Sequence, residues 1–488
     1  MSNFILLLPY LLAVWSFTCA ITDDASGAGR AKIEMFDMAA IRDPSTLDVS
    51  VAKNWHVVRG TTPTRQKLVE ITVGEAYRGK DYRVPVQFVV PADRKAKGFL
   101  LTAGVSNRDL RTGGLHGDLI KAGVGFVRTH IANLPGPLKR ARDSLFYKTL
   151  DPRYRNFWIW PATYMRAITA AYAEKGHFEK GKILVSGFSK GGETSAVTLI
   201  NDERVTAAFG SVCPIYASPA RLSDPAALAR LDAYNRTWAR KKGATTESGT
   251  RRLTGGGWLG GLAGPSMKPG ALAAGKTRQD LQRFADRLAD RLFISRNVDK
   301  LKARNAQFLF HPGTHDMVCY DVIWGGRNAP DVPVYNAANS GHGKKGHPAN
   351  IRESNRAAFI ANHFMGGRKR MLEPPALSAT IRNGKLEVTV TFKPGSEEKS
   401  GRAFWIYDRG PDGSPAYLQD LIPDKNWKDM TYSKARKAWT VEIDLDRNAR
   451  HIDVFSNHQK TLSVDGKTYT TALSSPYTRV KLSDSRGR

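Results

Sequence analysis

The segment Gly187-Phe188-Ser189-Lys190-Gly191 constrains the fold of this chain more than any other feature. It follows an apolar run at 183–186 with the length and composition of a buried strand, and a helical pattern begins at its last residue. A serine between glycines at such a junction is typical of a tight turn that lifts the side chain above the edge of a sheet. The pentapeptide also arises by chance, so an ordinary turn between strand and helix is the alternative.

Apolar runs rich in β-branched residues alternate with helical patterns through most of the chain. The first two runs are separated by a Gly-containing turn and predict an antiparallel pair. The later alternation predicts a mostly parallel sheet flanked by helices, with ligands bound at the carboxyl ends of its strands. The expected strands are 68–72, 82–90, 99–103, 123–131, 183–186, 207–213, 307–310 and 332–335, and the expected helices include 158–174, 191–200 and 348–365.

The strand pattern stops between 216 and 305, where two helical stretches, 224–242 and 279–301, flank the Gly-rich centre 255–261. Long irregular inserts in compact domains are usually functional or disordered, and we expect this one to form a lid or cap over the site. Over 375–488, apolar and polar residues alternate in runs separated by Gly, Pro and Asp. This pattern predicts a β-sandwich.

A serine hydroxyl becomes a useful nucleophile only when a histidine accepts its proton and a carboxylate holds that histidine in the right tautomer. In hydrolases with this kind of turn, the acid and then the histidine follow the serine along the chain. Asp316 lies just past the strand expected at 307–310, and His342 lies just past the one expected at 332–335. We therefore assign Ser189, Asp316 and His342 as the candidate catalytic residues.

Each partner of the serine has rivals in the same loops. Asp321 is a rival to Asp316 as the acid. His315 and His347 are rivals to His342 as the base, although the Gly neighbours of His342 favour it because they allow close approach. A transition metal is another alternative, since imidazole and carboxylate suit zinc. The triad also accounts for the serine, so we predict no metal and no cofactor; a metal would use His311, His315, Asp316, His342 and His347.

Main-chain N–H groups are expected to stabilise the oxyanion of an acyl-transfer reaction. One donor would be Lys190, which follows the serine, and the other would come from the loop after the strand expected at 99–103. We assign Val105 as the second donor from its position alone.

The segment Gly270-Ala-Leu-Ala-Ala-Gly-Lys-Thr277 matches the P-loop pattern that binds nucleotide phosphates. That loop needs a buried strand immediately before it, and the stretch 264–269, with one glycine and two prolines, cannot form one. No helix-turn-helix, RRM or zinc-finger spacing occurs in the chain either. We expect neither a nucleotide site nor a nucleic-acid partner.

The first twenty residues carry no charged side chain and contain an apolar run at 4–17 followed by small residues. This pattern predicts a signal peptide over 1–20 and a secreted, periplasmic or cell-envelope protein. An uncleaved anchor and an N-terminal segment buried in the protein interior are the alternatives, because no Lys or Arg precedes the run. No other stretch approaches the ~20 apolar residues of a membrane span, so stable membrane insertion is not expected.

Two cysteines remain after the expected signal peptide, Cys213 and Cys319. They would meet at the rim of the site if the strands before them are neighbours. A disulfide that braces the acid loop and a pair of buried free thiols are the two alternatives.

The formal charge of the chain is +29, of which the sequence from Met371 onward contributes only +4. The catalytic part is therefore strongly basic. Such a cleft would concentrate anionic substrates, for example uronates or sulfated glycans. A basic surface without any such partner is the alternative.

With these elements in this order, the chain resembles the PhoPQ-activated pathogenicity-related protein family, most strongly at 158–195 and 308–342. The resemblance spans about 69–482 and implies an α/β-hydrolase fold with the same three triad positions. The family has no well-defined substrate, and the His-rich acid loop and Gly-rich insert of this chain depart from its pattern. A weaker similarity to glucuronoyl esterases rests on the cation after the nucleophile, here Lys190, where those enzymes have a longer Arg-Asn-Gly-Lys run.

The sequence thus predicts a signal peptide at 1–20, an α/β-hydrolase catalytic domain at 21–370 with its insert at 216–305, and a β-sandwich domain at 375–488. The expected activity is that of an exported serine hydrolase that cleaves a carboxylic ester of a small molecule or glycan through an acyl-enzyme. Amide or peptide cleavage by the same triad is one alternative. A catalytically silent protein that binds the envelope or a polysaccharide is the other. The oligomeric state is not predicted.

Overall fold

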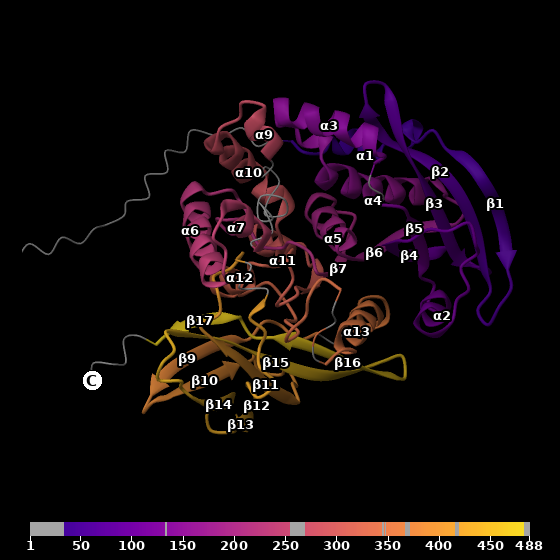
Figure 1. Cartoon of the computed structure of the whole chain (residues 1–488). Coiled ribbons are helices and arrows are strands. Elements are labelled where there is room, and N and C mark those ends of the chain that lie inside the picture. Colours follow the sequence, from indigo (N-terminus) through magenta and orange to yellow (C-terminus); the bar gives the residue numbers. More distant parts are fainter. Residues whose placement is uncertain are drawn as a thin grey trace, which may run out of the picture. The chain divides into compact units, whose positions relative to one another are not determined.

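An eight-stranded sheet with helices on both faces forms the first part of the structure (Figure 1). The computed structural model describes residues 34–131, 134–253, 269–343, 346, 348–366, 371–414 and 419–482. The signal peptide expected at 1–20 and the Gly-rich centre expected at 255–261 lie outside these residues. From Ile33 onward the chain is one compact unit.

The strands of this sheet follow the order β1-β2-β3-β5-β4-β6-β7-β8. The first four in this order pair antiparallel, and the pairs from β5 to β8 are parallel. A mixed sheet of this kind fits the expected α/β-hydrolase fold. Its strands are β1 (Ser50–Val58), β2 (Thr64–Tyr77), β3 (Lys80–Pro91), β4 (Ala96–Ala103), β5 (Gly125–Thr129), β6 (Phe178–Phe188), β7 (Ala207–Ser211) and β8 (Gln307–His311).

The parallel strands carry continuous apolar runs because helices cover them from both sides. Every residue of β7 is buried, as a strand covered on both faces requires. Helices α4 and α5 lie on one face of the sheet, and α2 and α13 lie on the other (Figure 1). The helices are α1 (Met38–Arg42), α2 (Gly114–Lys121), α3 (Gly136–Thr149), α4 (Asn156–Ala173), α5 (Lys190–Asn201) and α13 (Ile351–Met365).

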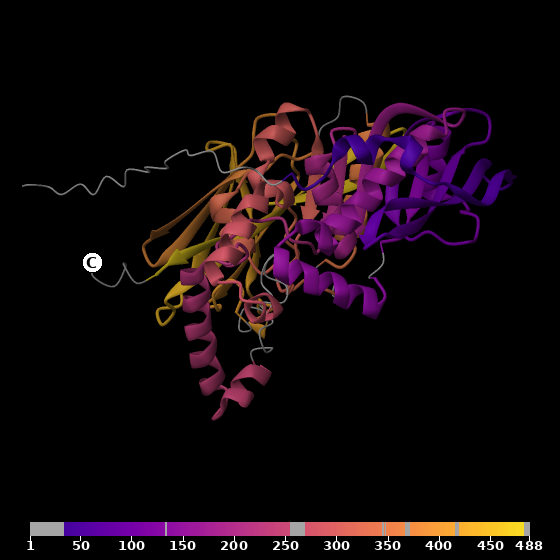
Figure 2. The same ribbon diagram turned by 90° about the horizontal axis from the view of Figure 1, so that it is seen from above.

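In the described residues, the insert between β7 and β8 consists of helices joined by loops and turns. Its apolar positions on α10 (Arg278–Leu292) pack toward α5, and α9 (Pro269–Ala273) packs on α3. Figure 2 shows α6 (Pro225–Lys241) and α7 (Glu247–Leu253), in magenta, extending away from the rest of the chain. The helix expected at 279–301 ends at Leu292, and the chain resumes a helix in α11 (Val298–Ala303).

The segment that matches the P-loop pattern has an ordinary structural role. It forms α9 and a turn, and Thr277 caps α10 through a capping box with Asp280. The threonine that would reach a metal–nucleotide complex in a P-loop is instead a helix cap.

The strand expected at 332–335 does not form. Two isolated bridges, Phe310 with Val334 and Gly313 with Ala337, take its place beside β8. Pro333 has no N–H to donate, so this segment cannot complete a ladder of hydrogen bonds. The segment nevertheless lies where the expected strand would lie, next to the end of β8.

The last part of the chain forms two antiparallel sheets, β13-β14-β10-β9 and β12-β11-β15-β16, with β17 pairing β15. Alternation explains their shared core, because Leu386, Val388 and Val390 of β10 are buried and their neighbours are not. The strands are β9 (Ala376–Arg382), β10 (Lys385–Thr391), β11 (Ser400–Tyr407), β12 (Trp427–Asp429), β13 (Thr431–Ser433), β14 (Ala438–Asp444), β15 (His451–Val464), β16 (Lys467–Ser474) and β17 (Thr478–Lys481).

A buried asparagine on α13 joins the second sheet to the first part of the fold. Asn355 Oδ1 accepts from the N–H of Ala472 at 2.6 Å and from Thr471 Oγ1 at 2.7 Å. Its amide nitrogen donates to the carbonyl of Ala472 and lies 2.8 Å from His311 Nε2.

Among the described residues, no helix has the length and apolar character needed to cross a bilayer.

Candidate functional site

Ser189 stands at the turn between the end of β6 and the start of α5. Its backbone has φ 55° and ψ −120°, a conformation that residues with a Cβ rarely adopt. A Cβ on Gly187 would lie 2.3 Å from the carbonyl carbon of Gly191. One on Gly192 would lie 2.8 Å from the carbonyl oxygen of Ser211. The turn therefore requires glycine at positions 187 and 192 and holds the serine in a strained conformation.

Ser189, His342 and Asp316 form one chain of hydrogen bonds. Ser189 Oγ lies 2.8 Å from His342 Nε2, and His342 Nδ1 lies 3.1 Å from both carboxylate oxygens of Asp316. With Nδ1–H donating to the carboxylate, Nε2 is left to accept the proton of the serine hydroxyl. The structure thus brings together the three residues that the sequence assigned to the site.

The carboxylate of Asp316 is fully buried. Burial raises the pKa of Asp316, while the N–H of Val318 at 2.7 Å and the imidazole of His342 act in the opposite direction. Gly313 makes room for this residue, because a Cβ there would lie 2.6 Å from the Cβ of Asp316. The buried carboxylate is positioned to hold one histidine tautomer, and the imidazole side chain itself is 30% exposed.

The rival residues have other partners. Asp321 is fully buried and accepts from the guanidinium of Arg221 at 2.7 and 2.8 Å, so it serves a buried ion pair. His315 Nε2 lies 2.8 Å from the carbonyl of Asp420, and burial lowers the pKa of His315 to about 3. His347 lies outside the described residues.

Of the described residues proposed for a metal site, Asp316 and His342 contact each other, whereas His311 and His315 have other partners. His311 is buried against Phe209 and Tyr335, and burial lowers the pKa of His311 to about 3. In the part of the chain that the structure describes, no group of three His, Cys, Asp or Glu side chains could hold a metal ion.

The two main-chain N–H groups expected to stabilise the oxyanion, those of Lys190 and Val105, differ in whether they already have a hydrogen-bond partner among the described residues. Lys190 is the first residue of α5, where helix N–H groups have no partner within the helix. Val105 is not available as the second donor, because its N–H donates to the carbonyl of Thr129 at 3.3 Å. The N–H of Gly104 donates to the same carbonyl at 2.9 Å. The continuation of the β4–β5 pairing past the end of β4 consumes both groups, and sequence position alone does not reveal that.

Cys213 and Cys319 are both buried free thiols that lie close together. Cys319 Sγ lies 3.4 Å from the carbonyl oxygen of Cys213. The structure therefore has the second of the two arrangements left open by the sequence, and the disulfide is not formed.

Three side chains near the serine were not identified from the sequence. Phe188 is 44% exposed, and its ring lies 5.7 Å from the imidazole of His342. The guanidinium of Arg352 lies 5.0 Å from the centre of the same Phe188 ring. Glu193 lies one helical turn after Ser189, and desolvation raises the pKa of Glu193 to about 7. Only the spacing of four residues from the serine would have pointed to Glu193.

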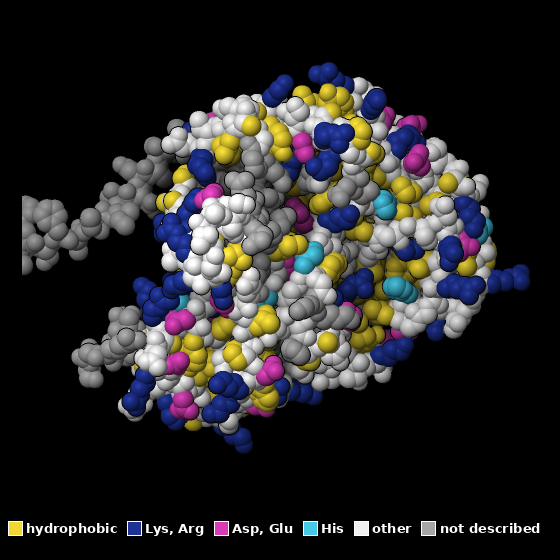
Figure 3. Space-filling model, in the orientation of Figure 1, with side chains coloured by type: hydrophobic (Ala, Val, Ile, Leu, Met, Phe, Trp, Pro, Cys, Tyr) yellow, Lys and Arg dark blue, Asp and Glu magenta, His cyan; other side chains and the backbone are white. Residues whose placement is uncertain are grey.

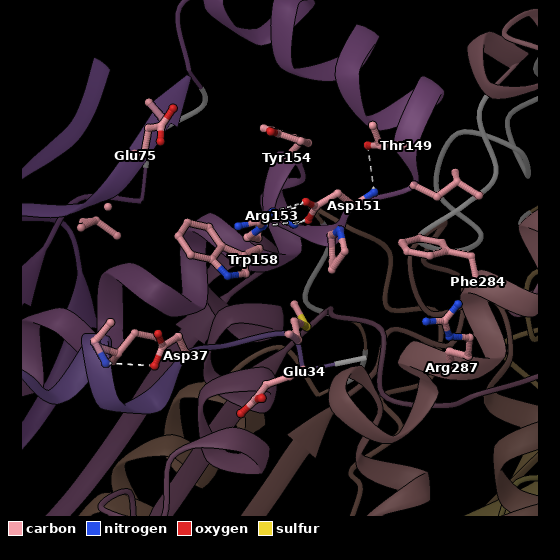
Figure 4. Close-up of a pocket in the computed structure, with 18 of the residues that line it drawn as sticks. Glu34, Asp37, Glu75, Thr149, Asp151, Arg153, Tyr154, Trp158, Phe284 and Arg287 are labelled. Atoms are coloured by element: carbon pink, nitrogen blue, oxygen red, sulfur yellow. Dashed lines mark hydrogen bonds and ion pairs between the residues drawn. The ribbon is translucent and has the colours of Figure 1, made fainter. Parts of the chain in front are cut away.

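Two cavities need to be distinguished. The larger, of about 1370 Å³, is lined by residues such as Trp158, Asp151 and Arg153, and no triad residue lines it (Figure 4). A second cavity of about 580 Å³ is lined by Phe188 and Lys190, the two chain neighbours of Ser189. No triad residue lines this second cavity either, but Gly187, Phe188, Lys190 and Gly191 of the serine turn do, so it is the cavity that adjoins the candidate site.

Basic side chains extend well beyond the site. Figure 3 shows Lys and Arg scattered across the visible face, with fewer Asp and Glu among them. The net charge alone therefore does not locate a binding surface.

Comparison with known proteins gives structural similarity at low sequence identity. No protein-family model and no curated protein sequence matches the chain. An acetyl xylan esterase from a Paenibacillus species is 14% identical over 66% of this chain and 91% of its own, with a TM-score of 0.36. A glucuronoyl esterase from Teredinibacter turnerae is 14% identical over 58% of this chain and 66% of its own, with a TM-score of 0.32. An acylaminoacyl peptidase from Pyrococcus horikoshii is 11% identical over 64% of this chain and 50% of its own, with a TM-score of 0.33.

Proposed function

We propose that this chain is an exported serine hydrolase that cleaves a carboxylic ester through an acyl-enzyme on Ser189. The observation that carries the proposal is the 2.8 Å contact between Ser189 Oγ and His342 Nε2 at a strained turn. Asp316 supports it from the far side of the imidazole. Membership in the PhoPQ-activated pathogenicity-related family is part of the same proposal and rests on the order of the motifs.

The first half of the reaction forms the acyl-enzyme. Ser189 Oγ attacks the carbonyl carbon of the ester while His342 Nε2 takes the hydroxyl proton. The carbonyl oxygen becomes an oxyanion, which the N–H of Lys190 stabilises. When the tetrahedral intermediate collapses, the C–O bond to the alcohol breaks and His342 returns the proton to the leaving oxygen.

The second half releases the acid. A water molecule attacks the acyl carbon and gives its proton to His342 Nε2, and the bond to Ser189 Oγ then breaks. The proton returns to Ser189, and the carboxylic acid leaves. Throughout both halves the buried carboxylate of Asp316 keeps Nδ1 protonated and the ring in one orientation.

The insert at 216–305 is the part of the chain that we expect to select what reaches the serine. Its helix α10 packs against α5, the helix that begins at the nucleophile. A cap in this position would determine the acyl and alcohol groups that the site accepts, while the triad chemistry would stay the same.

The proposal is tested with purified protein and a set of esters and aminoacyl amides, each assayed with wild type and Ser189→Ala. We expect turnover of esters that is lost in Ser189→Ala and that persists in the presence of a chelator. Turnover of amides alone would assign the same triad to a peptidase. Turnover that survives Ser189→Ala would rule out the serine mechanism.

Export is tested separately. The mature protein recovered from producing cells should begin near residue 21, as mass spectrometry of its N-terminal peptide would show. An N-terminus at Met1 would contradict cleavage.

A further inference from the structure

The cavity of about 580 Å³ beside Ser189 is lined by a group of basic side chains. Its walls come from the end of β4, the turn around the serine, and the first turns of α13. Arginines 352 and 356 of α13 contribute to one wall, and Lys190 contributes to another. Among the described residues that line it, Glu353 is the only carboxylate. The positive charge in this cavity is therefore not balanced by its own lining.

The charge of Arg352 is only weakly compensated. Its Nη1 is buried and has no hydrogen-bond partner among the described residues. Its Nη2 lies 3.6 Å from the carboxylate of Glu353, which is itself about half exposed. The guanidinium rests on the Phe188 ring at 5.0 Å, so this side chain is held in place by stacking as well as by charge. A guanidinium held beside a cavity, with only one half-exposed carboxylate at 3.6 Å, can still bind an anion.

Arg356 lies one helical turn further along α13 and faces the same cavity. Its Nε donates to Ser186 Oγ at 3.0 Å, and the charge of Glu353 also acts on it. Burial lowers the pKa of Arg356, which shows that its charge has given up hydration. An oxyanion in the cavity would replace interactions that Arg356 lost when it left water.

The position of the cavity links this charge to the reaction. The Phe188 ring lies close to both groups, with the guanidinium of Arg352 at 5.0 Å and the imidazole of His342 at 5.7 Å. Lys190, the expected oxyanion donor, and Gly104, at the end of β4, also line the cavity. A group bound here would therefore lie next to the turn that carries Ser189.

Resting on the proposed function, we infer that this cavity is a subsite for an anionic oxygen group of the ester substrate, of which a carboxylate is the simplest. Arg352 and Arg356 bind the anion, and Phe188 fixes Arg352 in the orientation that reaches it. The substrates are then esters that carry a negative charge near the scissile bond.

Two matched ester pairs test this subsite at low ionic strength. The first compares para-nitrophenyl valerate with mono-para-nitrophenyl glutarate, which adds a carboxylate to the acyl arm. The second compares the methyl ester of para-acetoxybenzoate with para-acetoxybenzoate, which adds it to the alcohol arm. We expect kcat/KM to favour the charged member of one pair by about tenfold or more, as charge-assisted hydrogen bonds to a buried arginine would give.

The variants decide whether the arginines cause this preference. Arg352→Gln and Arg356→Gln should each reduce the ratio of charged to neutral kcat/KM by about fivefold or more. Arg352→Lys, which keeps the charge, should give an intermediate ratio. Arg59→Gln is the matched control, because it removes one positive charge from an exposed position on the sheet hairpin outside the cavity. It should keep the wild-type ratio. Reaction of each variant with a fluorophosphonate would establish that its site is folded.

The failures of the subsite and of the hydrolase are distinguishable. If neutral esters are turned over through Ser189 but neither pair shows a preference for charge, the subsite is wrong and the hydrolase stands. The same conclusion follows if Arg352→Gln and Arg356→Gln both keep the wild-type ratio. If no ester is turned over and Ser189 does not react with the fluorophosphonate, the proposed function fails and the subsite fails with it.

Discussion

The N–H of His315 donates to the carbonyl oxygen of Ser340 at 2.8 Å. This bond joins the loop of Asp316 to the loop of His342, and Thr314 Oγ1 adds a second link to the carbonyl of Ala337 at 2.8 Å. The acid and the base are thus held in register although no strand forms at 332–335. Backbone and hydroxyl bonds at the end of β8 replace the missing ladder.

Asp316 and Asp321 should respond in different ways to replacement by asparagine. In Asp316→Asn the amide can still accept from Val318, but it no longer stabilises the imidazolium and no longer favours the required tautomer. We expect kcat/KM to fall by about 10³- to 10⁴-fold while the free energy of unfolding changes by less than about 1 kcal/mol. Ester turnover and denaturant unfolding measure the two quantities.

Asp321→Asn is the matched variant, five positions along the chain. It leaves the buried guanidinium of Arg221 without its charge partner, and we expect it to lower the free energy of unfolding by about 3–5 kcal/mol. A large loss of activity in a fully stable Asp321→Asn protein would show that Asp316 was wrongly assigned as the acid.

Gly187 and Gly191 of the serine turn should differ in how well they tolerate a Cβ atom. In Gly187→Ala the new Cβ would meet the backbone of residue 191 at 2.3 Å, so the turn has to shift. We expect a loss of about 3 kcal/mol or more in unfolding free energy. In Gly191→Ala the nearest atom is a methyl carbon of Ile131 at 3.6 Å, and the change should stay within about 1 kcal/mol. Equal stability of the two variants would show that the turn is not strained as described.

Glu193 should make stability depend on pH. The pKa of Glu193 is raised from 4.5 to about 7, so the native state holds a proton between these pH values that the unfolded state has lost. Stability from this group is therefore present below pH 4.5 and is lost as the pH rises toward 7. Glu193→Gln removes the effect, and we expect its unfolding free energy relative to wild type to be about 1–2 kcal/mol higher at pH 8 than at pH 4.5.

The charges of Arg221 and Arg155 lower the pKa of Glu193, so a variant of either arginine would not be a suitable control. The comparison uses Glu353→Gln, which changes an exposed carboxylate of another helix. A pH profile for Glu193→Gln that runs parallel to that of wild type would contradict the raised pKa.

The order of the serine, aspartate and histidine segments along the chain is sufficient to predict which three residues meet at the site. Ser189 and Asp316 follow β6 and β8, and His342 follows the segment beside β8, so all three come after the carboxyl ends of parallel segments, where such loops lie together. The alternating residues of β10 allowed the sandwich core to be predicted in the same way. In both cases a periodic pattern was sufficient because burial on defined faces is what the pattern records.

Other features depend on contacts that no local pattern records. Val105 has the expected position in the chain, but the carbonyl of Thr129 takes its N–H. Phe188 and Arg352 are far apart in sequence and meet only because α13 begins beside the serine turn. Strand β1 is largely exposed, so it lacks the apolar alternation by which strands are found.

Labelling with a fluorophosphonate tests the central claim most directly. The purified protein is treated with the probe, digested, and mapped by mass spectrometry, with Ser189→Ala and His342→Ala treated in parallel. The proposed mechanism predicts one adduct on the peptide that contains Ser189, none in Ser189→Ala, and labelling slowed by about 10³-fold or more in His342→Ala. A folded wild-type protein that leaves Ser189 unmodified, or one that is labelled equally fast without His342, would contradict the account.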